Sequence, residues 1–163
     1  MNSEPSRPDD AKLLDEAVRL AIESIGEGGG PFGALVVRDG EVLATGANEV
    51  TRSLDPTAHA EVVAIRRACQ AVGDFRLDGC TLVCSCEPCP LCLSAALWAR
   101  VERVVYAADR HDAAAAGFDD SALYELFTRP REEWTRLSIR QVRTGFETGP
   151  FVAWQESPDK VEY

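Results

Sequence analysis

The sequence predicts an α/β fold of three layers, α/β/α, in which helices cover both faces of a mixed sheet. Two patterns indicate this fold class. In some segments the apolar residues recur at helical spacing, and in the segments between them they form short continuous runs. This succession is typical of alternating helices and strands. The turn residues Asp39–Gly40 join two such runs as a hairpin, so the sheet contains an antiparallel pair. A chain of 163 residues can build one full core, and we expect a single domain.

The first half of the chain predicts one helix followed by the hairpin. Its apolar positions recur at helical spacing until a run of glycines ends them, and aliphatic residues flank the hairpin turn. The expected elements are a helix over 13–25 with Asp9 or Asp10 as its cap, strands over 34–37 and 42–45, and a polar loop over 46–56.

The second half predicts helices and strands in alternation. Thr57 has the side chain of a helix N-cap, and Pro88 suits the first turn of a second helix. The expected elements are helices over 57–71, 88–98 and 121–127, and strands over 81–84, 101–107 and 137–142, the last of which makes the sheet five-stranded.

Two short motifs carry the residues suited to chemistry. The motif H-x-E places His59 and Glu61 at the start of one predicted helix, and P-C-x-x-C places Cys89 and Cys92 at the start of the next. One histidine and two cysteines can bind zinc tetrahedrally and leave its fourth position open, as in catalytic sites. Side chains at a helix start lean toward the N-terminus, so the ligands can meet at one point. The positive helix ends favour the thiolate forms of the cysteines.

Two other interpretations of these residues remain open. His59 could simply begin a helix, with the cysteines as small buried side chains. The site could also be a structural zinc site, for which Cys84 or Cys86 would supply a fourth ligand. Glu61 argues against a structural site, because such a site has no use for a carboxylate beside its ligands.

Composition and charge narrow the classes of partner. The chain has 27 acidic and 17 basic residues, a formal net charge of −10, and no stripe of lysine and arginine. Nucleic-acid binding needs a basic surface, so we expect no nucleic-acid partner. No apolar run is long enough to span a membrane, and the polar N-terminus shows no signal peptide. We therefore expect no membrane contact and a cytoplasmic location.

The motifs together resemble the cytidine-deaminase-like superfamily, and more narrowly its small zinc-dependent guanine deaminases. H-x-E followed by P-C-x-x-C is the signature of zinc deaminases and is shared with tRNA adenosine deaminases. The segment Ala116-Gly117-Phe118-Asp119-Asp120 marks the guanine branch more specifically. The resemblance covers about residues 11–154, and its other matching stretches are 31–34, 48, 55–61, 85–92, 98–100 and 112–115.

The resemblance implies a role for each matching residue. His59, Cys89 and Cys92 would bind one Zn²⁺ per chain, and Glu61 would carry protons from the attacking water to the ring and the departing amine. Asp120 would share in catalysis and read the amino-imino edge of guanine. The residues implied to contact the purine are Phe32, Asn48, Ala60, Trp98, Asp120 and Tyr163.

Some of these residues also have simpler interpretations. Asn48 could be a turn residue, and the aromatic side chains could belong to the core. Asp119 or Asp120 could cap the helix expected at 121–127 while the other faces the substrate. We assign the substrate contact to Asp120.

The implied activity is hydrolytic deamination of guanine to xanthine and ammonia. The same chemistry on guanosine, a pterin or an aminotriazine is an alternative. A tRNA adenosine or cytosine deaminase is a weaker one, because the acidic charge counts against it. A non-catalytic zinc module is the third hypothesis, and Glu61 counts against that.

The expected domain limits follow from the resemblance. Residues 1–10 form a disordered polar tail, 11–154 the zinc-dependent deaminase domain, and 155–163 a C-terminal tail. The resemblance implies a homodimer in which this tail can cross to the partner subunit, so that Tyr163 closes the neighbouring site. Pro158 interrupts a helix that is usual at this point, and a frayed terminus is the other interpretation.

Overall fold

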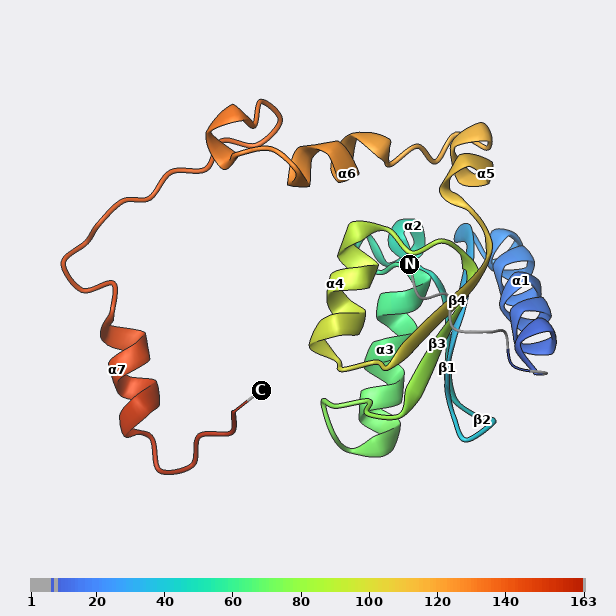
Figure 1. Ribbon diagram of the computed structural model, residues 1–163, viewed down its shortest axis with the longest axis horizontal. Helices are drawn as coiled ribbons and strands as arrows, with labels where there is room; N and C mark the ends of the chain where they lie inside the picture. Colours follow the sequence, from blue (N-terminus) through green and yellow to red (C-terminus); the bar gives the residue numbers. More distant parts are fainter. Residues whose placement is uncertain (1–6, 8, 163) are drawn as a thin grey trace. The chain divides into compact units, whose positions relative to one another are not determined.

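The computed structural model describes residues 7 and 9–162, and the chain forms two compact units that meet between Tyr124 and Glu125. The first unit contains a mixed four-stranded sheet in the order β2-β1-β3-β4 (Figure 1). β1 is antiparallel to β2 and β3, whereas β3 and β4 are parallel. The strands are β1 (Gly30–Arg38), β2 (Glu41–Asn48), β3 (Cys80–Cys86) and β4 (Arg103–Ala108).

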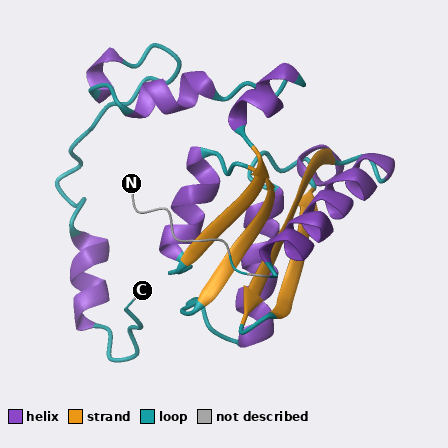
Figure 2. Cartoon of the chain, turned by 45° about the vertical axis from the view of Figure 1, so that its right-hand side comes forward, coloured by secondary structure: helices purple, strands orange, loops and turns teal. Residues whose placement is uncertain are grey.

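Helices cover both faces of this sheet, which confirms the α/β fold with a mixed sheet. Helix α1 (Asp10–Gly26) lies on one face, and α3 (Ala60–Val72) and α4 (Pro90–Trp98) lie on the other (Figures 1 and 2). Within the described residues, no helix is long and apolar enough to cross a membrane. The remaining helices are α2 (Val50–Ser53), α5 (Arg110–Ala115), α6 (Ser121–Phe127), the 3₁₀ helix η1 (Arg131–Glu133) and α7 (Gly149–Glu156).

The core follows from the alternation of side chains along β1. Ala34 and Val36 join the apolar cluster beneath α3 and α4. Leu35 and Val37 point to the opposite face and join the cluster beneath α1. A strand covered on both faces is apolar at consecutive positions, which is why this run is continuous rather than alternating.

Gly46 in β2 sets how closely α3 approaches the sheet. A Cβ atom at this position would lie 2.2 Å from the Ala60 carbonyl oxygen and 2.5 Å from the Ala64 nitrogen. Only glycine therefore allows the first turn of α3 to reach the sheet, and this turn carries the residues of the H-x-E motif.

The expected fifth strand over 137–142 is wrong. The sheet has four strands, and residues 137–142 are irregular and exposed. Leu137 and Ile139 alternate with polar residues as a strand would. A strand also needs a neighbouring backbone to satisfy its N–H and C=O groups, and the second unit contains no other strand among its described residues.

Helix α3 begins later than the sequence predicted. It starts at Ala60 with His59 at the N-cap. Thr57, the expected cap, lies instead in a turn in which its backbone N–H and its hydroxyl both donate to Asp55 Oδ1, at 2.8 and 2.7 Å. Asp55 thus competes successfully for the groups that would have started the helix.

Asp10 is the first residue of α1, with Asp9 at the N-cap position, and it is buried. Its carboxylate accepts two hydrogen bonds from the Arg103 guanidinium of β4, at 2.8 and 2.5 Å. Both side chains are only 9% exposed. These hydrogen bonds lower the pKa of Asp10 to about 2. The pair therefore joins α1 to the edge of the sheet.

Asp10→Ala should lower the free energy of unfolding by about 3 kcal/mol near neutral pH, because the Arg103 charge would stay buried without its carboxylate. The folded-state pKa of Asp10 is depressed, so its contribution is fully present above the ordinary value of 3.8 and is lost as the pH falls through about 2. Urea unfolding across this range measures the difference. Glu16→Ala removes an exposed carboxylate from the same helix and is the control; equal losses in both variants would contradict the prediction.

Candidate functional site

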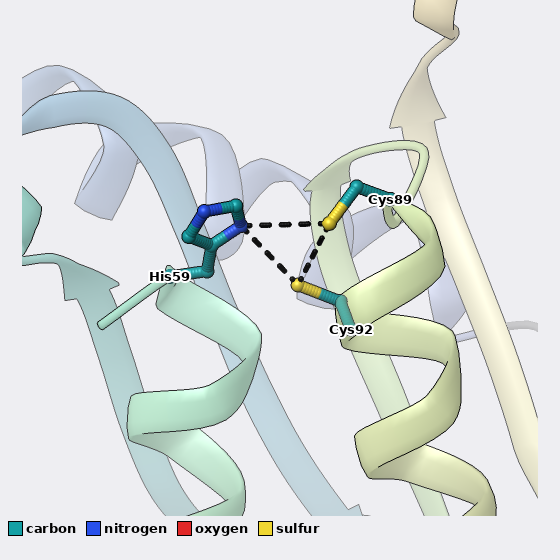
Figure 3. A group of neighbouring side chains, drawn as sticks. All are labelled: His59, Cys89 and Cys92. Atoms are coloured by element: carbon teal, nitrogen blue, oxygen red, sulfur yellow. Dashed lines mark hydrogen bonds between the residues drawn. The ribbon is translucent and has the colours of Figure 1, made fainter. Parts of the chain in front are cut away.

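The three predicted metal ligands lie together where α3 and α4 begin. Figure 3 shows the His59 imidazole pointing from the start of α3 toward the thiols of Cys89 and Cys92. His59 Nδ1 lies 3.5 Å from each sulfur atom, and the two sulfur atoms are 3.5 Å apart. Cys89 is the N-cap of α4, with Pro90 as the first helical residue. The helix therefore starts two residues after Pro88, where the sequence had placed its beginning.

The spacing of these atoms fits a tetrahedral zinc ion. Zinc binds nitrogen at about 2.0–2.1 Å and thiolate sulfur at about 2.3 Å, so three ligands of one tetrahedron lie about 3.5–3.8 Å apart. In the part of the chain that the structure describes, the group of potential ligands is His59, Cys89 and Cys92 alone. Cys84 and Cys86 are not part of it, so the structural-site interpretation has no fourth protein ligand there.

The electrostatics of the cysteines favour metal binding. Hydrogen bonding to Cys92 is the main influence that lowers the pKa of Cys89, and a hydrogen bond to His59 adds to it, giving about 4. The pKa of Cys92 is raised by the hydrogen bond to Cys89 and by burial. Cys89 and Cys92 would hold zinc as thiolates, and the lowered pKa of Cys89 favours that form.

Glu61 lies two residues beyond His59, in the first turn of α3, and is only 8% exposed. Burial raises the pKa of its carboxyl group. A carboxyl group with a raised pKa exchanges protons more readily near neutral pH than an ordinary glutamate does. This environment suits a proton carrier.

A cavity of about 690 Å³ opens beside these residues. It brings together side chains from β1, β2, α3 and the segment between α5 and α6. Of the residues implied by the sequence, it is lined by Phe32, Asn48, His59, Glu61, Cys89 and Asp120.

Asn48 has an orientation set by its neighbours. Its Oδ1 accepts a hydrogen bond from the Val50 backbone N–H at 3.3 Å, and the side chain is 9% exposed. Since the oxygen is engaged, the amide N–H groups are the part of Asn48 available to a molecule in the cavity. Asn48 can therefore stabilise the turn through its oxygen and contact a ligand through its amide N–H groups.

Asp119 and Asp120 have different environments. Asp119 Oδ1 accepts a hydrogen bond from the Ser121 N–H at 2.9 Å, at the start of α6. Hydrogen bonding from the Ser121 side chain, and then from its backbone, lowers the pKa of Asp119. The pKa of Asp120 is raised, mainly by burial and then by the Cys89 charge. Both aspartates line the cavity, and Asp120 is the one whose pKa responds to the charge of a metal ligand.

Two of the implied contacts, Trp98 and Ala60, do not line this cavity. Trp98 ends α4, is 67% exposed and does not line the cavity. About 13 Å of helix separates it from Cys89, because each residue adds about 1.5 Å. Ala60 is fully buried in the core cluster instead. Tyr163 lies outside the described residues.

The cavity also contains residues that sequence reasoning missed. Glu87 and Arg110 line it and form an ion pair at 3.3 Å. Glu87 directly precedes the P-C-x-x-C motif, and this position in the sequence could have indicated a role at the site. Nothing in the sequence near Arg110 indicates a functional role.

Comparison with known proteins gives one family for the chain. The cytidine and deoxycytidylate deaminase zinc-binding region matches residues 7–108. The guanine deaminase of Bacillus subtilis is 52% identical over 152 residues, which are 93% of this chain and 97% of that protein. The tRNA-specific adenosine deaminase of Aquifex aeolicus is 39% identical over 96 residues, 59% of this chain and 64% of that protein.

Comparison with solved structures also finds guanine deaminases. The X-ray structure of the Bacillus subtilis guanine deaminase matches with a TM-score of 0.90 at 51% identity, over 94% of this chain and 98% of that one. The guanine deaminase from Nitrosomonas europaea matches with a TM-score of 0.64 at 33% identity, over 72% of this chain and 67% of that one.

Proposed function

The chain belongs to the cytidine and deoxycytidylate deaminase zinc-binding family, and we propose that it is a zinc-dependent hydrolase that converts guanine and water to xanthine and ammonia. The observation that carries this proposal is the three-ligand group beside a buried carboxyl group in one cavity. The 52% identity to a guanine deaminase over nearly its whole length supports guanine as the substrate.

The reaction replaces the amino group on C2 of guanine by oxygen. Zinc, when bound by His59, Cys89 and Cys92, lowers the pKa of a water molecule from about 15.7 toward 7. Glu61 takes a proton from the attacking water and delivers it to the ring nitrogen, and then carries a second proton to the departing amine. This double use requires the carboxyl group to be within hydrogen-bond reach of both partners.

The polar residues of the cavity match the edges of guanine. The ring has an acceptor at O6 and donors at N1 and the C2 amino group. Asn48 presents N–H donors, and Asp120 presents a carboxylate that accepts from N1 and the amino group. Phe32 supplies an apolar wall for the ring face. Adenine has no donor at N1, so it would leave the Asp120 carboxylate unpaired.

The charge of the cavity favours an uncharged substrate. Among its described lining residues there is one arginine, Arg110, and no lysine, against the carboxyl groups of Glu61, Glu87, Asp119 and Asp120. Phosphate groups would be repelled by this lining and by the net charge of −10. These charges support the expectation that nucleic acid is not the substrate.

Ammonia release from guanine, guanosine, adenine, cytosine and cytidine tests the proposal directly. We expect guanine to be deaminated fastest, with adenine slower by about 10⁴-fold, because a site built around hydrogen bonds strongly rejects a ring that leaves them unmade. Faster turnover of adenine, cytosine or cytidine than of guanine would overturn the substrate assignment.

Asp120→Ala should lower guanine turnover by about 10²-fold or more, since it removes a group proposed to bind the substrate and relay a proton. Asp119→Ala is the matched control and should change turnover only a few-fold, because its carboxylate caps α6. Both variants should retain zinc. The opposite ranking would transfer the role to Asp119, and small equal effects would count against guanine.

A homodimer, with the C-terminal tail crossing to the partner subunit, belongs to the same proposal. None of the described residues of the second unit is buried, and Val142, Phe146 and Phe151 are 71%, 80% and 67% exposed. Apolar side chains of this kind need a surface to pack against, which supports assembly. The cytoplasmic location, the domain limits and the role of Tyr163 stay predictions from the sequence.

A further inference from the structure

We propose that Arg110 is a positioning residue that holds Asp120 in place, by joining the wall that carries Asp120 to the loop that carries Cys89. The Asp120 wall is defined as residues 109–124, and the ligand loop as residues 87–89. This inference rests on the proposed function, because Asp120 is the residue through which Arg110 would act.

The Asp120 wall is held without a core of its own. It consists of α5, the linking residues 116–120 and the first part of α6, and none of its residues is buried. Its position therefore depends on a few specific contacts, because there is little apolar burial to fix it.

The first of these contacts joins Arg110 to Glu87 of the ligand loop. Glu87 Oε2 accepts a hydrogen bond from the Arg110 backbone N–H at 3.0 Å, and Oε1 lies 3.3 Å from Arg110 Nη2. Glu87 itself is 16% exposed, and its backbone N–H donates to the Ala108 carbonyl oxygen at 2.8 Å. One well-anchored carboxylate thus holds both the backbone and the side chain of Arg110.

The second contact joins the far end of the wall to the same loop. The Arg110 guanidinium lies over the Tyr124 ring, 4.6 Å from its centroid. The Tyr124 hydroxyl donates to the Pro88 carbonyl oxygen at 3.0 Å. Burial, followed by the charge of Asp120, raises the pKa of Tyr124 to about 12, so the hydroxyl keeps its proton and remains a donor.

Arg110 therefore touches two attachments of the wall, and a third, the packing of the Phe118 ring on the Phe32 ring of β1 at 5.1 Å between centroids, does not involve it. Arg110 is bound by Glu87 at the start of α5 and covers the Tyr124 ring in α6, and the residues between these points carry Asp120. Pro88 directly precedes the ligand Cys89. A displacement of about 1 Å in a reacting group can cost about 10²-fold in rate, so holding this spacing has a measurable consequence.

The activity test compares Arg110→Gln with Arg19→Gln, which removes an exposed arginine that also pairs with two carboxylates on α1. We expect Arg110→Gln to lower kcat/KM for guanine by about 10- to 10²-fold with zinc retained, and Arg19→Gln to leave it unchanged. Arg110→Lys should recover part of the loss, since it keeps the charge near Glu87 and Tyr124. Unchanged kcat/KM in Arg110→Gln would overturn the proposal.

A double-mutant cycle separates positioning from a general structural role. In an Asp120→Asn background, Arg110→Gln should cost no more than about 3-fold further, because the carboxylate that it positions is already gone. A loss of the same factor in both backgrounds would overturn the proposal, because it would show that Arg110 does not act through Asp120.

Amide hydrogen exchange gives a measurement that does not depend on turnover. Peptides from residues 109–124 should exchange about 10-fold faster in Arg110→Gln than in the wild type, and Arg19→Gln should not change them. Unchanged exchange would overturn the proposal even if guanine is the substrate. If exchange is faster in Arg110→Gln but the wild-type protein does not deaminate guanine, the proposed function is wrong. The role of Arg110 in holding the Asp120 wall would still stand.

Discussion

Glu61→Gln is expected to lower guanine turnover by about 10⁴-fold or more. A general acid–base group typically contributes about 10²- to 10⁴-fold, and Glu61 is proposed to move more than one proton in each turnover. Glutamine keeps the shape of the side chain but cannot carry a proton. Steady-state ammonia release, measured beside metal content, checks the prediction.

The zinc content of Glu61→Gln is the internal control for this result. Glu61 is not part of the ligand group of His59, Cys89 and Cys92, so about one zinc per chain should remain. Activity above about a tenth of the wild-type value would show that Glu61 is not the proton carrier. Loss of zinc along with activity would instead show that it supports the metal.

Cys89→Ala is expected to lose both the metal and the activity. Two ligands would remain where a catalytic zinc site needs three from the protein, and the lost group is the cysteine whose pKa lies lowest, at about 4. After dialysis against a chelator, metal analysis should find zinc well below one per chain, and guanine turnover should fall to the background rate.

Cys69→Ala is the matched control for this variant. Cys69 lies in α3, and its thiol lies 3.7 Å from the Phe75 carbonyl oxygen, outside the ligand group. It should keep full zinc and nearly full activity. Full zinc and activity in Cys89→Ala would show that Cys89 is not a ligand of a catalytic zinc ion.

The sequence predicted the parts of the site that depend on short spacing. His59 and Glu61 stand two residues apart, and Cys89 and Cys92 three apart, so local backbone geometry alone brings each pair to one helix start. The helix starts themselves were misplaced by two or three residues. A side chain such as Asp55 can compete for the first N–H groups, and this local competition is hard to resolve from sequence.

Tertiary structure decided the contacts that join distant segments. Trp98 matched the family pattern, yet the length of α4 carries it away from the cavity. The buried pair of Asp10 and Arg103 joins residues 93 positions apart, and no local pattern in the sequence indicated that they pair. The strand expected at 137–142 failed for the same reason, because strand formation depends on a partner edge as well as on alternation.

By itself the sequence determined the fold class, the ligand set and the chemistry that this set supports, because these depend on periodicity and on residues close together in the chain. Only the tertiary structure decided that Asp120 lines one cavity with His59 and Glu61, and that Glu87, Arg110 and Tyr124 meet beside it. The reason is physical: contacts across the fold depend on how whole helices and strands pack, and no short stretch of sequence specifies that arrangement.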